Sequence, residues 1–397
     1  MKKTKTGRRN FLKATVGSAA GWAAISTLPE LPDERFASDF NKLIEPYQQP
    51  ANRETPASGP TKIKFAAIGI NHDHIYGQVQ AVQRGGGELV SFFAREPDLV
   101  ANFSKRFPEA KIARSENEIL DNPNIQLVVS AAIPNERGPL GIKVMRHGKD
   151  YMADKPGITT LAQLAEVRQV QAETKRIYSI LYSERLENRA TVKAGELVKA
   201  GAIARVIQTI GLGPHRMNPK QRPSWFFEHE KYGGIICDIG SHQIDQFLFF
   251  TGSKQGQVVT SQVGNVHHPQ YPGLDDFGDI VLRGDGGVGY VRIDWFTPDG
   301  LGTWGDVRLT ILGTDGYIEL RKNIDIAGRP GGNHLFLTDQ KATRYIDCST
   351  QALSYGEQLV SDILNRTETA MPQQHCFLAT ELALQAQQQA QRLKLNI

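Results

Sequence analysis

Apolar strand-like runs alternate regularly with helical stretches between residues 63 and 153. The run at 63–69 reads as a buried strand that ends in glycine, and a helical stretch at about 74–84 follows it. The pattern continues with strands at 88–94, 125–132 and 150–153, with a helix that ends near 107 and with another helix at 139–147. This alternation predicts parallel βαβ units with right-handed crossovers, which bind ligands at the carboxyl ends of their strands.

The second half of the chain has a different pattern. After strands at 177–181 and 206–212, short strands separated by glycine turns run from 257 to 320, which is typical of an antiparallel-type sheet. These strands are expected at 279–282, 288–295, 307–312 and 317–320, and an apolar-periodic helix at 376–395 ends the pattern. With 397 residues the chain is expected to form two α/β domains, at 61–185 and 186–397.

The net charge of +4 comes from the N-terminus, where six basic residues precede the first acidic one, Glu30. The remaining 40 basic residues face 42 acidic ones, which excludes a nucleic-acid footprint. The three cysteines are far apart, so neither a disulfide framework nor a zinc–cysteine cluster is expected.

Arg8 and Arg9, followed by Phe-Leu-Lys and a modest apolar run, resemble the bacterial twin-arginine (Tat) export signal. The resemblance implies a signal peptide at 1–29, a Pro- and Ser-rich linker at 30–60 and a periplasmic protein. An uncleaved signal that anchors the protein to a membrane is the alternative.

The turn after the first strand reads Gly69-Ile70-Asn71-His72-Asp73-His74, which keeps only the first glycine of the dinucleotide fingerprint G-x-G-x-x-G. Asn71 can adopt the left-handed conformation that the second glycine would use. After the next strand, Ala94 occupies the position of the acid that binds the ribose of NAD, and Arg95 follows. This favours the 2′-phosphate of NADP, although Glu96 leaves NAD open.

Two glycines, Gly233 and Gly234, precede a stretch in which Asp238, His242 and Asp245 are spaced at i, i+4 and i+7. This spacing places them on one face of a helix, where a carboxylate beside an imidazole makes an acid/base pair. The alternative is a buried helix with one satisfied histidine and a surface aspartate.

Three motifs together resemble the glucose–fructose oxidoreductase/inositol dehydrogenase (Gfo/Idh/MocA) family from about Lys62 to the C-terminus. They are Ile133-Pro134-Asn135, Asp154-Lys155-Pro156 and the stretch with Asp238 and His242. The resemblance implies an N-terminal Rossmann domain and a C-terminal α/β domain with an open mixed, mainly antiparallel sheet that often forms an oligomer interface. It further implies that Lys155 contacts substrate and nicotinamide, Asp238 orients substrate, and His242 is the general acid/base.

The resemblance also implies NAD or NADP as cofactor and a sugar or polyol as substrate. The expected cofactor contacts are Gly69, Asn71, His72, His74, Ala94, Arg95, Ile133, Pro134, Asn135 and Lys155. The expected substrate contacts are Tyr182, Arg185, His215, Arg216, Trp225 and Asp238, with core or loop roles as the alternative for each. Gly138 departs from the family, since many relatives have a histidine there.

The histidine pairs His72/His74 and His267/His268 have no carboxylate at metal-site spacing in the sequence, so no metal is expected. His72 or His74 could instead serve as a further acid/base group.

The sequence therefore predicts an exported NAD(P)-dependent oxidoreductase that keeps its cofactor, because no dinucleotide pool exists outside the cytoplasm. Two alternatives remain: a redox-neutral NAD-dependent glycosidase that acts through a 3-keto-sugar, and a non-catalytic sugar-binding protein.

Overall fold

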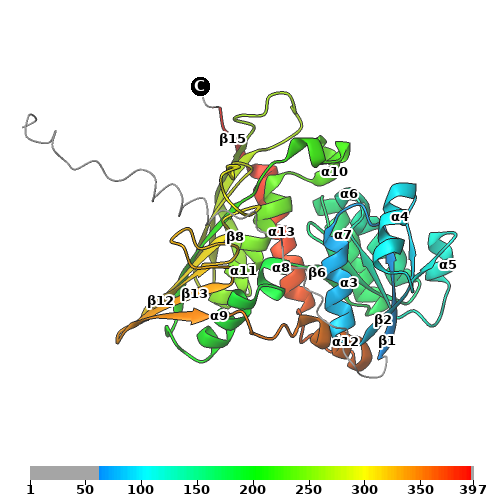
Figure 1. The fold of residues 1–397 in the computed structure, drawn as a ribbon, viewed down its shortest axis with the longest axis horizontal. Coiled ribbons are helices and arrows are strands. Elements are labelled where there is room, and N and C mark those ends of the chain that lie inside the picture. Colours follow the sequence, from blue (N-terminus) through cyan, green and yellow to red (C-terminus); the bar gives the residue numbers. More distant parts are fainter. Residues whose placement is uncertain (1–61, 395–397) are drawn as a thin grey trace, which may run out of the picture. The chain divides into compact units, whose positions relative to one another are not determined.

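A computed structural model describes residues 62–394, so the expected signal peptide and linker lie outside the described residues. The first half forms a parallel sheet in the order β3-β2-β1-β4-β5-β6 (Figure 1). Its strands are β1 (Ile63–Ile68), β2 (Gly87–Phe93), β3 (Lys111–Ile112), β4 (Leu127–Ser130), β5 (Asp150–Asp154) and β6 (Tyr178–Leu181). The order reverses between β1 and β4, which is the switch point where sheets of this kind bind dinucleotides.

Helices connect these strands as the alternation predicts: α3 (His74–Arg84), α4 (Pro97–Arg106), α5 (Glu116–Leu120), α6 (Pro134–Arg146) and α7 (Leu161–Thr174). The expectation that α6 begins at Pro139 is wrong by more than one turn, because Pro134 opens it and Pro139 lies inside it. Proline lacks the N–H that would bond the carbonyl of Asn135. The Gln163 side chain donates to that carbonyl instead (2.9 Å).

The second half is the predicted mixed sheet, in the order β14-β13-β12-β11-β7-β10-β9-β8-β15. β7 runs parallel to β10 and β8 parallel to β15, whereas all other neighbours are antiparallel. The strands are β7 (Val206–Pro214), β8 (Gly256–Gly264), β9 (Phe277–Gly284), β10 (Val288–Asp294), β11 (Arg308–Gly313), β12 (Gly316–Arg321), β13 (His334–Asp339), β14 (Thr343–Asp347) and β15 (Gln391–Arg392). β13 and β14 extend the sheet beyond the strands that the sequence pattern predicted.

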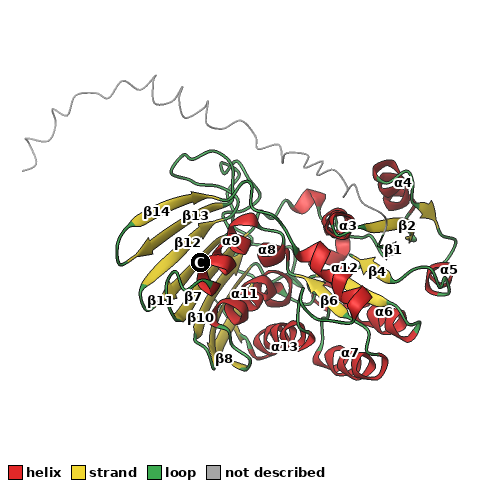
Figure 2. Cartoon of the chain, turned by 90° about the horizontal axis from the view of Figure 1, so that it is seen from below, coloured by secondary structure: helices red, strands yellow, loops and turns green. Residues whose placement is uncertain are grey.

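Helices cover one face of this sheet (Figure 2). They include α9 (Arg189–Lys199), α11 (Ser241–Thr251) and α13 (Gln373–Gln389). α13 packs against β8 on one side and against β6 and α7 on the other, so it joins the two halves. Among residues 62–394, no helix has both the length and the apolar character that a membrane crossing requires.

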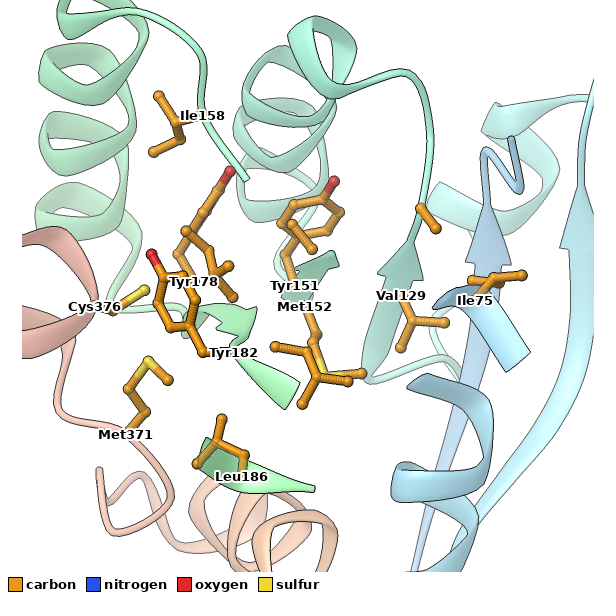
Figure 3. Packing of buried hydrophobic residues seen from close by; sticks show 14 of the residues in the cluster. Ile75, Val129, Tyr151, Met152, Ile158, Tyr178, Tyr182, Leu186, Met371 and Cys376 are labelled. Atoms are coloured by element: carbon orange, nitrogen blue, oxygen red, sulfur yellow. The ribbon is translucent and has the colours of Figure 1, made fainter. Parts of the chain in front are cut away.

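The C-terminal segment also completes the first half. α12 (Tyr355–Asn365) packs on α3, where a Cβ on Gly356 would lie 1.7 Å from the Ala81 carbonyl oxygen, so only glycine fits. The Gln373 side chain accepts from the Tyr178 amide (2.8 Å) and donates to its carbonyl (3.2 Å). Gln373 thereby forms hydrogen bonds with the backbone N–H and C=O of Tyr178 at the edge of β6, where no further strand pairs. Figure 3 shows Met371 and Cys376 from this segment beside Tyr178 and Tyr182 in one buried cluster.

Candidate active site

The turn after β1 has the backbone of a dinucleotide-binding turn despite its reduced motif. Gly69 has φ of +70°, and a Cβ there would lie 2.5 Å from the Cβ of Ala132. Glycine is therefore required for both conformation and space. α3 begins five residues later at His74, so its N-terminal amides follow directly on the turn. The similarity of this turn to a dinucleotide-binding turn therefore depends on Gly69 alone.

Asn71 links the turn to the end of β2. Its side-chain amide donates to Glu96 Oε1 at 2.8 Å, which brings a carboxylate to the turn two residues beyond Ala94. Arg95 points to Glu116 instead, with 3.4 Å between Nη2 and Oε1, and its side chain is 73% exposed. The structure thus places an acid, rather than the arginine, next to the turn.

His72, His74 and Asp154 lie together, which no motif in the sequence indicated. His74 Nδ1 is 2.9 Å from Asp154 Oδ1, and His72 Nδ1 is 3.5 Å from Asp154 Oδ2. The expectation that no carboxylate accompanies this histidine pair is wrong, because Asp154 comes from the end of β5, eighty residues away in sequence. Arg137 Nη2 also lies 3.1 Å from Asp154 Oδ2.

Arg137 holds the loop that carries Lys155. This arginine is buried in α6 and donates from Nε to the Ala132 carbonyl (2.7 Å) and from Nη1 to the Lys155 carbonyl (2.5 Å). Its guanidinium therefore connects the segment around Ile133, Pro134 and Asn135 with the segment Asp154-Lys155-Pro156.

Lys155 of the first half forms an ion pair with Asp238 of the second half. The ammonium Nζ lies 2.7 Å from Asp238 Oδ1, and both side chains are largely buried. Burial by itself would raise the pKa of Asp238, but the Lys155 ammonium outweighs it and the net shift is downward. The pair is therefore a charged lysine beside an ionised carboxylate.

The helix that carries His242 does not begin as a regular α-helix. Residues Ile236–Gly240 form a π-helical turn, η3, and α11 continues from Ser241. The wider turn changes the phase of the helix faces. The π-helical turn interrupts the regular spacing that was expected to place Asp238, His242 and Asp245 on one face, and Asp245 pairs with Arg185 (2.6 Å) and His375 (2.8 Å).

His242 is a buried, uncharged imidazole. Burial lowers its pKa to about 4; Glu184 opposes this shift, and Lys155 and His74 add to it. Among residues 62–394 its Nδ1 has no hydrogen-bond partner, which leaves this atom available to a ligand hydroxyl.

A buried polar network of Glu184, Lys322 and Gln243 lies near His242. The Glu184 carboxylate contacts Lys322 Nζ (3.1 Å) and accepts from the Gln243 side chain (2.6 Å). Although burial favours the protonated acid, Lys322 holds the pKa of Glu184 at about 2. Glu184 lies three residues beyond the end of β6, in α8 (Ser183–Leu186), so the rule that ligands lie at the carboxyl ends of strands could have identified it. Lys322 and Arg137 carried no such signal.

The expected substrate residues divide into two groups. His215 stays with the site: burial, together with Lys155, lowers its pKa to about 3, and its ring packs on Trp304 at 4.6 Å. Trp225 lies 6.4 Å from His72, measured between ring centroids, and so faces the phosphate turn.

The other three side chains have structural partners instead. Arg185 is fully engaged with Asp245. The Tyr182 hydroxyl lies 3.2 Å from Thr380 Oγ1, and only the edge of its ring approaches His242. Arg216 donates to the carbonyls of Pro298 (2.9 Å) and Leu301, and so holds that loop. The substrate roles expected for these three residues stay predictions.

Comparisons with known proteins agree with this architecture. A family model described as the GFO/IDH/MocA C-terminal domain matches residues 191–319. The solved structure of an oxidoreductase from Erwinia carotovora atroseptica is 45% identical with a TM-score of 0.82, covering 84% of this chain and 100% of that one. The chain belongs to the Gfo/Idh/MocA family.

Other Gfo/Idh/MocA relatives are more distant. The scyllo-inositol 2-dehydrogenase (NAD(+)) of Bacillus subtilis is 25% identical over 207 residues, which cover 51% of this chain and 56% of that protein. The levoglucosan dehydrogenase of Pseudarthrobacter phenanthrenivorans is 25% identical over 202 residues, 50% and 51% of the two chains. The matches to these curated relatives span about half of each protein's length. Like other members of the Gfo/Idh/MocA family, the protein is an oxidoreductase.

Proposed function

We propose that this protein transfers hydride between a carbinol carbon of a sugar or polyol and a nicotinamide dinucleotide. One observation carries the proposal: the 2.7 Å contact of Lys155 with Asp238, beside the unpartnered His242, at the carboxyl end of β5. Relatives named for scyllo-inositol and levoglucosan support a polyhydroxylated substrate.

The residues present fit a dinucleotide. The turn at Gly69 and the start of α3 would hold the pyrophosphate, since helix N-terminal amides favour anions. Glu96 stands where it can accept hydrogen bonds from the ribose hydroxyls, and Arg95 is turned toward Glu116. This arrangement supports NAD over NADP, against the preference that Ala94 and Arg95 suggested in the sequence.

When bound, the dinucleotide supplies the hydride acceptor or donor at its nicotinamide ring. The chain's own residues handle the substrate and its proton. The Lys155 ammonium stabilises negative charge that develops on the carbinol oxygen, and Asp238 fixes the direction of that ammonium. With its pKa lowered to about 4, His242 is unprotonated near neutral pH and can accept the hydroxyl proton.

We further propose that the twin-arginine segment directs the folded protein, with its cofactor, to the periplasm. There the cofactor must be regenerated in each cycle, either by paired oxidation and reduction of two sugars or by redox-neutral glycoside cleavage. Release of an aglycone without net reduction distinguishes the second from the first.

The test is to purify the mature protein, denature it, and identify any released dinucleotide by absorbance and mass. We expect NAD in stoichiometric amount. If the protein releases no dinucleotide and binds neither NAD nor NADP when these are added back, the proposal is wrong and a sugar-binding protein becomes the better interpretation. Where NAD is found, scyllo-inositol and levoglucosan are the first substrates to test.

A further inference from the structure

The turn between β1 and α3 contains a side-chain cluster that the proposed hydride transfer does not use. One ring nitrogen of His72, one ring nitrogen of His74 and a carboxylate oxygen of Asp154 all lie within 4.8 Å of one another. Two of the three come from a tight turn and the third from the end of a buried strand, so the sheet fixes their relative positions.

The donor atoms suit a transition metal. Two imidazole nitrogens and one carboxylate oxygen are the ligands that Zn²⁺ and similar first-row ions take at about 2.0–2.2 Å. Ligands at that distance from one ion lie roughly 3–3.5 Å apart. His74 Nδ1 lies 2.9 Å from Asp154 Oδ1 and His72 Nδ1 lies 3.5 Å from Asp154 Oδ2, so each imidazole is close to this spacing from one of the two carboxylate oxygens.

The neighbouring cations limit the affinity without blocking the site. Arg137 shares the Asp154 carboxylate, while Lys155 is already paired with Asp238, so these four side chains sum to no net charge. Nε and Nη1 of Arg137 donate to backbone carbonyls. Its Nη2 lies 3.1 Å from Asp154 Oδ2 without forming a hydrogen bond, since Oδ2 has no hydrogen-bond partner among residues 62–394. Arg137 can therefore support the carboxylate as a neighbour while a metal ion occupies its other side.

We propose that His72, His74 and Asp154 together bind one divalent transition-metal ion. The His74 side chain is 41% exposed, whereas that of Asp154 is 2% exposed, so the open coordination positions face outward from the sheet. These positions suit water or a substrate oxygen. The proposal goes beyond hydride transfer and does not depend on it, because the ion is detected without substrate.

The experiment titrates the untagged, purified protein with Zn²⁺ by calorimetry and with Co²⁺ by visible absorption, and repeats both titrations after NAD is added. We expect one ion per chain and Co²⁺ ligand-field bands. The variants H72Q and H74Q should each bind at least about tenfold more weakly, since each removes one ligand. Because His74 is half-exposed, H74Q should keep the wild-type melting temperature and thereby separate ligand loss from unfolding.

The matched control is H268Q. His268 Nδ1 lies 2.8 Å from Oδ2 of another buried aspartate, Asp276, but far along the chain from the turn, so this variant should bind metal as the wild type does. The proposal is overturned if neither ion binds at millimolar concentration, with or without NAD, or if H72Q and H74Q bind like the wild type. The cluster would then be a hydrogen-bonded histidine–aspartate group. A missing dinucleotide would refute the proposed function and leave the metal titration unaffected.

Discussion

Lys155 and Asp238 are 83 residues apart in sequence, yet their charged atoms lie 2.7 Å apart between the two halves of the molecule. Neither half alone contains the pair. The contact therefore makes the site depend on correct packing of the parallel sheet against the helix that begins at η3.

Replacing Lys155 by methionine should abolish most of the activity. The variant loses the ammonium that stabilises the developing alkoxide, and we expect kcat to fall by roughly 10²–10⁴-fold. The steady-state rate of dinucleotide reduction, measured with whichever of scyllo-inositol and levoglucosan the wild type oxidises, tests this prediction. Wild-type kcat in K155M would exclude Lys155 from the chemistry.

The Glu184–Lys322 pair should matter for stability. Removing one partner leaves a buried charge uncompensated, so E184Q and K322M should each lower the free energy of unfolding by about 3–5 kcal/mol. The double variant should be more stable than either single one, because no charge remains unpaired. Urea denaturation measures all three, and K193M, which breaks the exposed Lys193–Glu196 pair, should cost at most about 1 kcal/mol.

The buried imidazoles predict acid sensitivity. His242 and His215 have folded-state pKa values of about 4 and about 3, below the ordinary value of 6.5. Below pH 6.5 the unfolded chain therefore takes up protons that the folded protein does not, and the free energy of unfolding falls as the pH drops toward 4. Glu184, with its pKa held at about 2, adds a further loss below its ordinary value of 4.5.

The measurement compares urea denaturation at pH 7.5 and 4.5 for the wild type and for H215Q/H242Q. The variant should lose less stability between these two pH values, by an amount of the order of a few kcal/mol. If the free energy of unfolding falls equally in both proteins, these two histidines do not cause the loss of stability in acid.

Gly69 should be essential for dinucleotide binding. In G69A the new Cβ meets Ala132 and the positive φ is strained, so the turn must shift and dinucleotide should no longer copurify. Gly77 in α3 is the control, because a Cβ there meets no atom within 4 Å. G77A should retain dinucleotide and gain about 0.5–1 kcal/mol from helix propensity. Equal dinucleotide content in G69A and wild type would contradict the assigned turn.

Glu96 should determine the preference for NAD. E96Q removes the charged acceptor at the ribose, so the Kd for NAD should rise roughly tenfold while that for NADP falls or stays constant. Calorimetry with both dinucleotides measures this. Because Arg95 is exposed and directed to Glu116, R95Q should change neither constant; a selective loss of NADP in R95Q would restore the assignment made from sequence.

Local pattern was sufficient to predict the parallel sheet, since β1, β4 and β5 are almost entirely buried. It also identified Lys155 and Asp238, through their motifs. The partners of Asp154 and Glu184 could not be predicted, because His74, Arg137 and Lys322 reach them only through the tertiary fold. The π-helical turn at 236–240 breaks the regular period on which the helical-face argument for Asp245 rests.

The position of Gln373 on the edge of β6 has a consequence for synthesis. A ribosome that has delivered every strand of the parallel sheet must still make almost two hundred residues before it delivers the side chain that pairs with Tyr178. The first half thus stays unfinished until residue 373 has been made, and a chain that stops before that residue leaves the edge open to pairing with another nascent chain. Completion of the first half is therefore tied to synthesis of the segment that carries Gln373.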